Sequence, residues 1–286
     1  MSATATDYDP IIELPPDLQI AEGPAIQSRE TWHLPRDKWR KIREQSAGAG
    51  VKVAVLDTGY YQHPTLPKAL AERSFIRGQG VADGNGHGTH CAGTVLSRDE
   101  DIGVAPQAEL IVGKVLSNGG SGSSSGIAAG VNWAIDAGAD IISMSLGGGS
   151  RYEPTVTAIK RAFSKGIIVC CAAGNSGFNG SRNTIGYPAR SGESICVGAL
   201  ASNYRPAGFS SGGSQMVIAA PGQNILSCSH RGSGFVTMSG TSMATPMVAG
   251  EFALIVSMMR AQGQASWNSV QAVNEFVKAN ATDLLA

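Results

Sequence analysis

The sequence has few charged residues and no excess of either sign. Charged residues make up 15% of the 286 positions, whereas about 25% is usual for a globular protein. The 22 basic and 22 acidic side chains give a formal net charge of zero. A neutral chain lacks the positive surface that binds phosphate backbones or anionic lipids. We therefore expect neither a nucleic acid nor a membrane as partner.

Long apolar runs are also missing. No uninterrupted apolar stretch approaches the ~20 residues needed to cross a bilayer. The first ten residues, MSATATDYDP, contain neither the basic nor the apolar segment of a secretory signal. Five cysteines stand among apolar or small neighbours, and we expect buried free thiols rather than a disulfide framework: Cys91, Cys170, Cys171, Cys196 and Cys228. These features favour a cytoplasmic location.

Glycine is abundant. The chain has 37 glycines and 42% hydrophobic residues, which is enough apolar material for a large core and excludes a disordered chain. The glycines follow no three-residue period, so a collagen-like structure is excluded as well. Many glycines with little charge indicate a compact body whose loops are tight and made of small residues.

Short apolar segments alternate with helical ones from about residue 37 onward. Strands are predicted at 51–56, 110–116, 140–145, 167–171 and 194–198, and helices at 37–43, 127–137, 155–165, 242–259 and 267–278. Continuous apolar strands between helices indicate an α/β fold with a parallel sheet covered on both faces. Residues 31–286 are predicted to form one domain. Residues 1–30 are predicted to be an N-terminal extension, because the prolines near its middle disfavour a helix or a central strand.

Three glycine-flanked segments contain Asp57, His87 and Ser242. Asp57 ends the first predicted strand, and ligands of parallel α/β sheets bind at the carboxyl ends of strands. A serine becomes a good nucleophile when a histidine takes its proton, and the histidine in turn needs a carboxylate to orient it. Taken singly, Asp57 could cap a turn or bind a metal, His87 could be a structural donor or a metal ligand, and Ser242 could be a helix N-cap.

The three segments closely resemble those of the subtilisin family of serine endopeptidases. They read VAVLDTG at 53–59, GHGTHCAGTV at 86–95 and GTSMATP at 240–246, and DGNGHGTHCAG at 83–93 is most similar to the proteinase K branch. The resemblance covers about residues 37–260. It implies a three-layer α/β fold with a mostly parallel, about seven-stranded sheet flanked by helices. It also implies hydrolysis of peptide bonds through an acyl-enzyme, with Asp57 as orienting acid, His87 as general base and acid, and Ser242 as nucleophile.

A fourth segment, AAGNSG at 172–177, resembles the oxyanion-hole motif of the same family. By this resemblance the side chain of Asn175 donates to the alkoxide of the tetrahedral intermediate, and the backbone N–H of Ser242 is the second donor. The alternative for Asn175 is a residue of a left-handed turn.

Two further segments, SNGGSG at 117–122 and SLGG at 145–148, resemble the edges that pair with the substrate backbone. The resemblance implies a substrate-binding set of ten residues: Gly120, Ser121, Gly122, Ser145, Leu146, Gly147, Ala172, Ala173, Gly174 and Gly186. Because these segments carry no charge, they predict an apolar or aromatic side chain before the scissile bond. The alternative is that the glycine runs are only turns.

The sequence departs from the family where calcium is concerned. The family commonly has an aspartate in a His-Pro-Asp-Leu turn as a calcium ligand, but here the turn is HPTL at 63–66. Asp99, Glu100 and Asp101 form an acidic turn. We expect this turn to be solvated, and a structural calcium ion is the alternative. No cofactor is expected to be required for the chemistry.

Both ends of the chain also differ from secreted subtilisins. The N-terminal extension resembles the short proline-containing one of intracellular subtilisins, and residues 11–15 are expected to act as an intramolecular inhibitor; a surface-packed tail is the alternative. Residues 281–286 stop short of the family's terminal strand and helix, which suggests a C-terminally truncated domain. A dedicated processing protease and a pseudoprotease are competing interpretations, and the intact set of four catalytic residues argues against the latter.

Overall fold

A seven-stranded parallel sheet forms the centre of the protein. The computed structural model describes residues 11–14, 19–21, 31–264 and 267–280. The strand order is β10-β9-β8-β7-β3-β5-β4, and every neighbouring pair is parallel. The bounds are β3 (Lys52–Asp57), β4 (Ala71–Ser74), β5 (Glu109–Lys114), β7 (Ile141–Met144), β8 (Ile168–Ala172), β9 (Ile195–Leu200) and β10 (Met216–Pro221). The α/β class and the parallel sheet are thereby confirmed.

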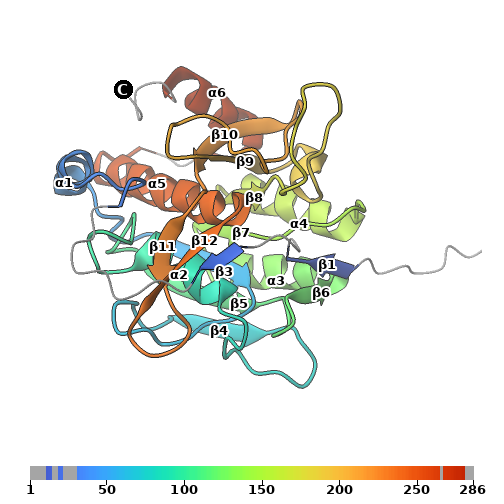
Figure 1. Cartoon of the computed structure of the whole chain (residues 1–286), viewed down its shortest axis with the longest axis horizontal. Coiled ribbons are helices and arrows are strands. Elements are labelled where there is room, and N and C mark those ends of the chain that lie inside the picture. The colour runs from blue at the N-terminus through green and yellow to red at the C-terminus, as the bar shows by residue number, and fades with distance from the viewer. Residues whose placement is uncertain (1–10, 15–18, 22–30, 265–266, 281–286) are drawn as a thin grey trace, which may run out of the picture.

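Helices cover both faces of this sheet, which gives three layers (Figure 1). Helices α2 (His87–Leu96) and α5 (Thr241–Ala261) pack against each other and against one face, whereas α3 (Ser124–Asp136) and α4 (Glu153–Ser164) cover the other. Helices α1 (Arg36–Gln45) and α6 (Val270–Asn280) and the 3-10 turn η1 (Ala189–Ser191) complete the fold. Because both faces are covered, the central strands are buried along almost their whole length.

Helix α5 is long and apolar enough, by length and composition alone, to cross a membrane. However, 72% of its most apolar window is buried inside the protein. It packs on β7, β8, β9 and β10. Its apolar composition is therefore explained by its position in the core.

The strands and helices expected from the sequence are present, with ends that differ by a few residues. The two edge strands of the large sheet, β4 and β10, have no counterpart among the expected strands. β4 reads Ala-Glu-Arg-Ser, and its residues are half-buried or exposed. β10 is half-buried over its first four residues. An edge strand has one neighbour and less cover, so its sequence lacks the continuous apolar run by which central strands are recognised.

Two small antiparallel sheets attach pieces of the N-terminal extension to the body. Strand β1 (Ile11–Glu13) pairs with β6 (Ser121–Ser123). Strand β2 (Gln19–Ala21) pairs with β12 (Phe235–Ser239), which pairs in turn with β11 (Ile225–Cys228). Pro15 and residues 281–286, which bear on the expectations about the two ends, lie outside the described residues.

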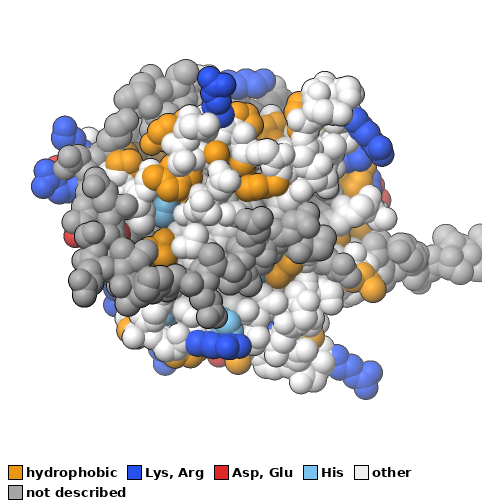
Figure 2. All heavy atoms as spheres, in the orientation of Figure 1, with side chains coloured by type: hydrophobic (Ala, Val, Ile, Leu, Met, Phe, Trp, Pro, Cys, Tyr) orange, Lys and Arg blue, Asp and Glu red, His pale blue; other side chains and the backbone are white. Residues whose placement is uncertain are grey.

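The surface and the cysteines agree with the composition. The face in Figure 2 carries scattered Lys and Arg side chains and few acidic ones. All five cysteines are free and buried, which confirms the expectation of thiols without a disulfide framework.

Candidate active site

Asp57 and His87 form a buried pair at the carboxyl edge of the sheet. Asp57 is the last residue of β3, and His87 is the first residue of α2. Oδ1 of Asp57 lies 2.7 Å from Nδ1 of His87 and also accepts a hydrogen bond of 2.7 Å from the Thr58 amide. Both side chains are almost completely shielded from solvent. The fold therefore brings together the acid and the histidine that the sequence singled out.

Asp83 fixes the start of α2 relative to the end of β3. Its Oδ1 accepts hydrogen bonds from the Thr58 hydroxyl at 2.9 Å and from the amides of Asn85 and Gly86 at 3.0 and 2.8 Å. Its Oδ2 accepts from the amide and the hydroxyl of Thr89 at 2.9 and 2.6 Å. This carboxylate thus connects the residue after Asp57 to both sides of His87.

Gly86, which precedes α2, adopts a left-handed conformation with φ of 106°. A Cβ at this position would lie 2.4 Å from Nδ1 of His230. Both the backbone angle and the lack of space require glycine.

Ser242, the second residue of α5, lies beside this pair. The Cys91 thiol is 3.8 Å from Nδ1 of His87 and 3.5 Å from the carbonyl oxygen of Ser242. The Ser242 hydroxyl donates to the carbonyl of Ser145 at 3.2 Å, and the Ser145 hydroxyl donates to the carbonyl of Ser242 at 2.8 Å. Among the described residues, Nε2 of His87 has no hydrogen-bond partner. The Ser242 hydroxyl therefore has to turn away from Ser145 to reach Nε2, and such loose geometry is common without substrate.

The Asp57 carboxylate stabilises the positive charge that the His87 imidazole gains when it takes up a proton. Burial alone would lower the pKa of His87, but the charge of the Asp57 carboxylate and its hydrogen bond outweigh burial. The pKa of His87 is therefore raised well above its ordinary value. Burial raises the pKa of the Cys91 thiol, which keeps it protonated at neutral pH.

Hydrogen bonds to its side-chain oxygen fix the orientation of Asn175. Its Oδ1 accepts hydrogen bonds from the amide and the hydroxyl of Thr241 at 2.9 and 3.0 Å. The Thr241 hydroxyl accepts in turn from the amide of Gly174 at 3.0 Å. These bonds leave Nδ2 of Asn175 as a donor beside Gly240 and Ser242. The amide of Ser242 is one of the first four of α5, which have no acceptor within the helix.

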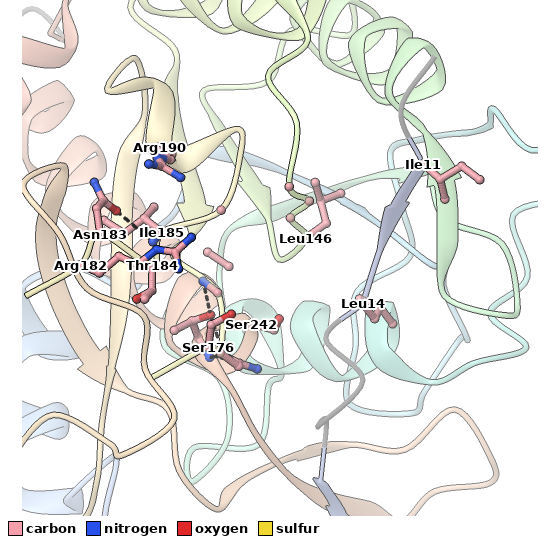
Figure 3. Close-up of a pocket in the computed structure, with 18 residues that line it drawn as sticks. Ile11, Leu14, Leu146, Ser176, Arg182, Asn183, Thr184, Ile185, Arg190 and Ser242 are labelled. Carbon is pink, nitrogen blue, oxygen red and sulfur yellow. Dashed lines mark hydrogen bonds between the residues drawn. The ribbon is translucent and has the colours of Figure 1, made fainter. Parts of the chain in front are cut away.

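A cavity of about 720 Å³ opens from Ser242 and Asn175 (Figure 3). Five members of the sequence-based substrate set line it: Leu146, Gly147, Ala172, Gly174 and Gly186. Ser145 lies behind it against Ser242. Ala173 is buried and is not among the lining residues; its carbonyl accepts from the Gly186 amide at 2.9 Å. Gly120, Ser121 and Gly122 lie at a separate edge, next to β1.

The cavity also has lining residues outside the sequence-based substrate set: Gly148, Gly149, Ser176, Arg182, Asn183, Thr184, Ile185, Arg190 and Thr241, together with Ile11 and Leu14 of the N-terminal segment. Glycine runs and recognisable motifs in the sequence had indicated the five members of the substrate set that line the cavity. No such signal marks Arg182 or Arg190, because only the folding of the 176–190 segment brings them to the cavity.

Comparison with known proteins identifies the family of this chain. Residues 48–284 match the model of the Peptidase S8 subtilase family. The chain belongs to the subtilase family. It is 45% identical over 229 residues to subtilisin DY of Bacillus licheniformis, covering 78% of this chain and 83% of that protein. It is 44% identical over 241 residues to subtilisin Savinase of Lederbergia lenta, covering 83% and 85%. This subtilase is thus a serine endopeptidase that acts on protein substrates.

The similarity extends close to both ends of this subtilase. The M-protease of Shouchella clausii strain KSM-K16 is 44% identical over 285 residues, which cover 96% of this chain and 71% of that protein. Like other subtilases, the protein needs no cofactor for its chemistry.

Carbonyl oxygens of the acidic turn of this subtilase are occupied by donors of the protein itself. The guanidinium of Arg43 donates to the carbonyls of Glu100 (2.6 Å) and Gly103, so a cation already engages the oxygens of this loop. The Asp101 carbonyl accepts from the Thr31 hydroxyl at 3.0 Å. Thr65, at the position of the family's aspartate, accepts from the Ser97 hydroxyl at 2.8 Å. The carbonyl oxygens of Glu100 and Gly103 therefore already bind a cationic group, the Arg43 guanidinium.

Among the described residues, one cluster combines three groups that could ligate a metal: Asp57, His87 and Cys91, with ligand atoms within 4.8 Å of one another. A metal there would compete with the hydrogen bond between Asp57 and Nδ1 of His87. The cluster therefore coincides with the Asp57–His87 pair and does not form a separate metal centre.

Proposed function

We propose that Ser242, His87 and Asp57 hydrolyse peptide bonds as a catalytic triad through an acyl-enzyme. The observation that supports this most is the buried Asp57–His87 pair, which Cys91 connects to Ser242 at the N-terminus of α5, and whose Nε2 has no hydrogen-bond partner among the described residues. A carboxylate on Nδ1 leaves Nε2 of the neutral imidazole as the proton acceptor, which is the tautomer that a serine nucleophile needs.

In this proposal each group has its own role. Nε2 of His87 takes the hydroxyl proton while Oγ of Ser242 attacks the carbonyl carbon, and Asp57 stabilises the imidazolium that forms. The alkoxide receives hydrogen bonds from Nδ2 of Asn175 and from the Ser242 amide. His87 then gives its proton to the departing amine, and the same groups activate a water that hydrolyses the ester.

The preferred substrates are proteins and peptides with an apolar or aromatic residue before the scissile bond. Leu146 and Ala172 supply apolar walls to the cavity next to Ser242, and the glycines beside them bring the backbone close to a bound side chain. A cavity of this kind gains most from burying a large apolar group.

Burst kinetics test the triad. With a p-nitrophenyl ester of an acylated phenylalanine, the full chain should release a burst of p-nitrophenol that is proportional to the enzyme concentration. Ser242→Ala should abolish the burst, whereas Ser164→Ala, at the exposed end of α4, should leave it unchanged. An equal burst from the Ser242→Ala variant would exclude Ser242 as the nucleophile.

We further propose that the N-terminal segment restrains this site. Strand β1 adds to β6 in antiparallel register, with Ile12 opposite Gly122, and the amide of Leu14 donates to the carbonyl of Gly120 at 2.8 Å. Such strand addition is how extended peptides bind to an exposed edge. Ile11 and Leu14 also line the cavity that contains Ser242. A substrate would need the same edge.

Ile12 anchors this segment. Its side chain is 4% exposed and lies between α3, Tyr152 and Tyr187. A Cβ on Gly148 would lie 2.6 Å from Cδ1 of Ile12, so the glycine leaves room for it. Ile11, in contrast, is 66% exposed.

This difference provides a matched pair of variants. Ile12→Asp loses about 1.5–3 kcal/mol of apolar burial, so activity on a small peptide should rise about 10- to 100-fold if the segment inhibits. Ile11→Asp should change it much less. Equal activity of wild type and Ile12→Asp would show that the segment is only surface-packed.

A further inference from the structure

The cavity beside Ser242 carries positive charge, whereas the substrate-binding segments recognised in the sequence are uncharged. Two of its lining residues, Arg182 and Arg190, are cationic, and none of the lining residues is Asp or Glu. In Figure 3 the two arginine side chains lie on the same side of the cavity, with Asn183, Thr184 and Ile185, across from Leu146. One wall is therefore apolar and the opposite one is basic.

The position of Arg190 is fixed by its backbone and by an aromatic ring. It belongs to η1, and its amide donates to the carbonyl of Gly186 at 2.8 Å, next to the cavity. Its guanidinium lies 5.9 Å from the centre of the Tyr187 ring. An arginine that stacks on a ring keeps its N–H donors free for a carboxylate.

No acidic side chain among the described residues forms an ion pair with either arginine. The nearby Glu193 is engaged by Lys160, at 3.1 Å. The other ion pairs between Lys or Arg and an acid in the described part of the chain involve Arg151, Arg161 and Arg260. The two positive charges at the cavity are therefore not neutralised by a carboxylate of the described chain.

We propose that Arg182 and Arg190 make this subsite select anionic side chains over neutral ones of the same size. This inference rests on the proposed function, since it concerns the residue before the scissile bond. The apolar wall still favours aromatic groups. The basic wall orders side chains of similar length by charge, so glutamate is preferred to glutamine and glutamine to lysine.

The expected size of the effect is modest, because both arginines are exposed and their charges are screened. Exposed ion pairs change binding by small factors each. Two of them together should favour glutamate over its isostere glutamine by about 3- to 10-fold at low ionic strength. Lysine should be disfavoured by a similar factor.

Four tetrapeptide p-nitroanilides that differ only in the last residue (Phe, Glu, Gln or Lys) test this inference. The full chain can be used, because a segment that closes the site lowers kcat/KM equally for all four and cancels from their ratios. We expect a Glu/Gln ratio of about 3–10 at low salt that falls toward 1 in about 1 M salt. Arg182→Ser with Arg190→Ser should bring the ratio to about 1.

A matched control is Arg77→Ser with Arg205→Ser, which removes the same charge from two exposed arginines outside the cavity lining; it should keep the wild-type ratio. A Glu/Gln ratio at or below unity in the wild type, or a ratio that both double variants lower equally, would overturn the role of Arg182 and Arg190 while Phe is still cleaved. Failure to cleave any of the four peptides would instead overturn the proposed function, and this inference with it.

Discussion

The two sides of Ser242 are built in opposite ways. On one side, Asp57, His87 and Asp83 are buried polar groups held by several short hydrogen bonds. On the other side, the cavity has walls of glycine backbone and small apolar residues, exposed arginines at its edge, and Ile11 and Leu14 of the chain's own N-terminal segment. The first side is a fixed network; the second is open and can take different occupants.

This contrast separates the chemistry from access to it. Buried charged groups that are held by hydrogen bonds tolerate few changes, since the loss of one group leaves its partner uncompensated. Substitutions in a surface cleft have smaller effects, because they remove mainly screened ionic interactions and apolar contacts with the bound group. Substitutions on the two sides should therefore differ by orders of magnitude in their effects.

The largest effect is expected for Asp57→Asn, which should lower kcat about 10⁴-fold. The substitution should also shift the acidic limb of the pH profile of kcat/KM. His87 accepts a proton only above its pKa, which Asp57 raises; without this anion, burial lowers the pKa, so the limb shifts to lower pH. A pH profile with an unchanged limb would contradict the assigned pairing.

Asn175→Ala should lower kcat with little change in KM, since the amide donates to an oxyanion that exists only after attack. The expected factor of about 10²–10³ is the one known for the oxyanion-hole asparagine of a subtilisin, and we carry it over to Asn175 by family membership. Steady-state kinetics on a peptide anilide measure it. A loss confined to KM would place Asn175 in ground-state binding instead.

Much of the fixed side could be predicted from the sequence, because its residues lie in short segments with local signatures. Asp57 ends an apolar strand, and His87 and Ser242 lie in the first turns of helices that follow a glycine. Since parallel strands end at one edge, separate segments are expected to converge there. The five hydrogen bonds of Asp83 could not be predicted, because they depend on the relative placement of β3 and α2.

Less of the open side could be predicted. The glycine segments indicated the edges, but β1, β2 and the cavity arginines depend on contacts between distant parts of the chain. Ile12 and Gly148, for example, are brought together only by folding. The uncharged cavity inferred from the motif segments lacked Arg182 and Arg190 for the same reason.

Asp83→Asn tests the fixed network through stability. An amide cannot accept all five hydrogen bonds, so the free energy of unfolding should fall by about 2–4 kcal/mol at pH 7. Burial would raise the pKa of Asp83, but hydrogen bonds from Gly86, Thr89 and Thr58 lower it below its ordinary value. Its contribution should therefore be present above the unfolded-state pKa of about 4 and be lost as pH falls through the lower folded-state pKa.

Urea denaturation at several pH values measures this difference. The control is Asp136→Asn, whose carboxylate is 66% exposed and pairs with Arg161; it should cost less than about 1 kcal/mol. Equal costs for the two variants would show that the network around Asp83 does not hold the site.

The smallest effect is expected when a calcium chelator is added. Because Arg43 engages the carbonyls of Glu100 and Gly103, EDTA should leave Tm unchanged within about 1 °C. Arg43→Met should lower the free energy of unfolding by about 1–2 kcal/mol, since two charge-assisted hydrogen bonds are lost from a half-buried site. Thermal unfolding with and without chelator checks both; a large drop in Tm with EDTA would mean that a calcium ion stabilises the protein.

Activation of Ser242 by the fixed pair of Asp57 and His87 is the feature on which the whole mechanism depends. A fluorophosphonate probe tests it most directly, with the modified residue located by peptide mass and the labelling rate followed against pH. We predict one adduct, on Ser242, at a rate that falls as His87 becomes protonated, and no adduct in Ser242→Ala. An adduct on another residue, or a rate that does not depend on pH and on Asp57, would contradict this activation.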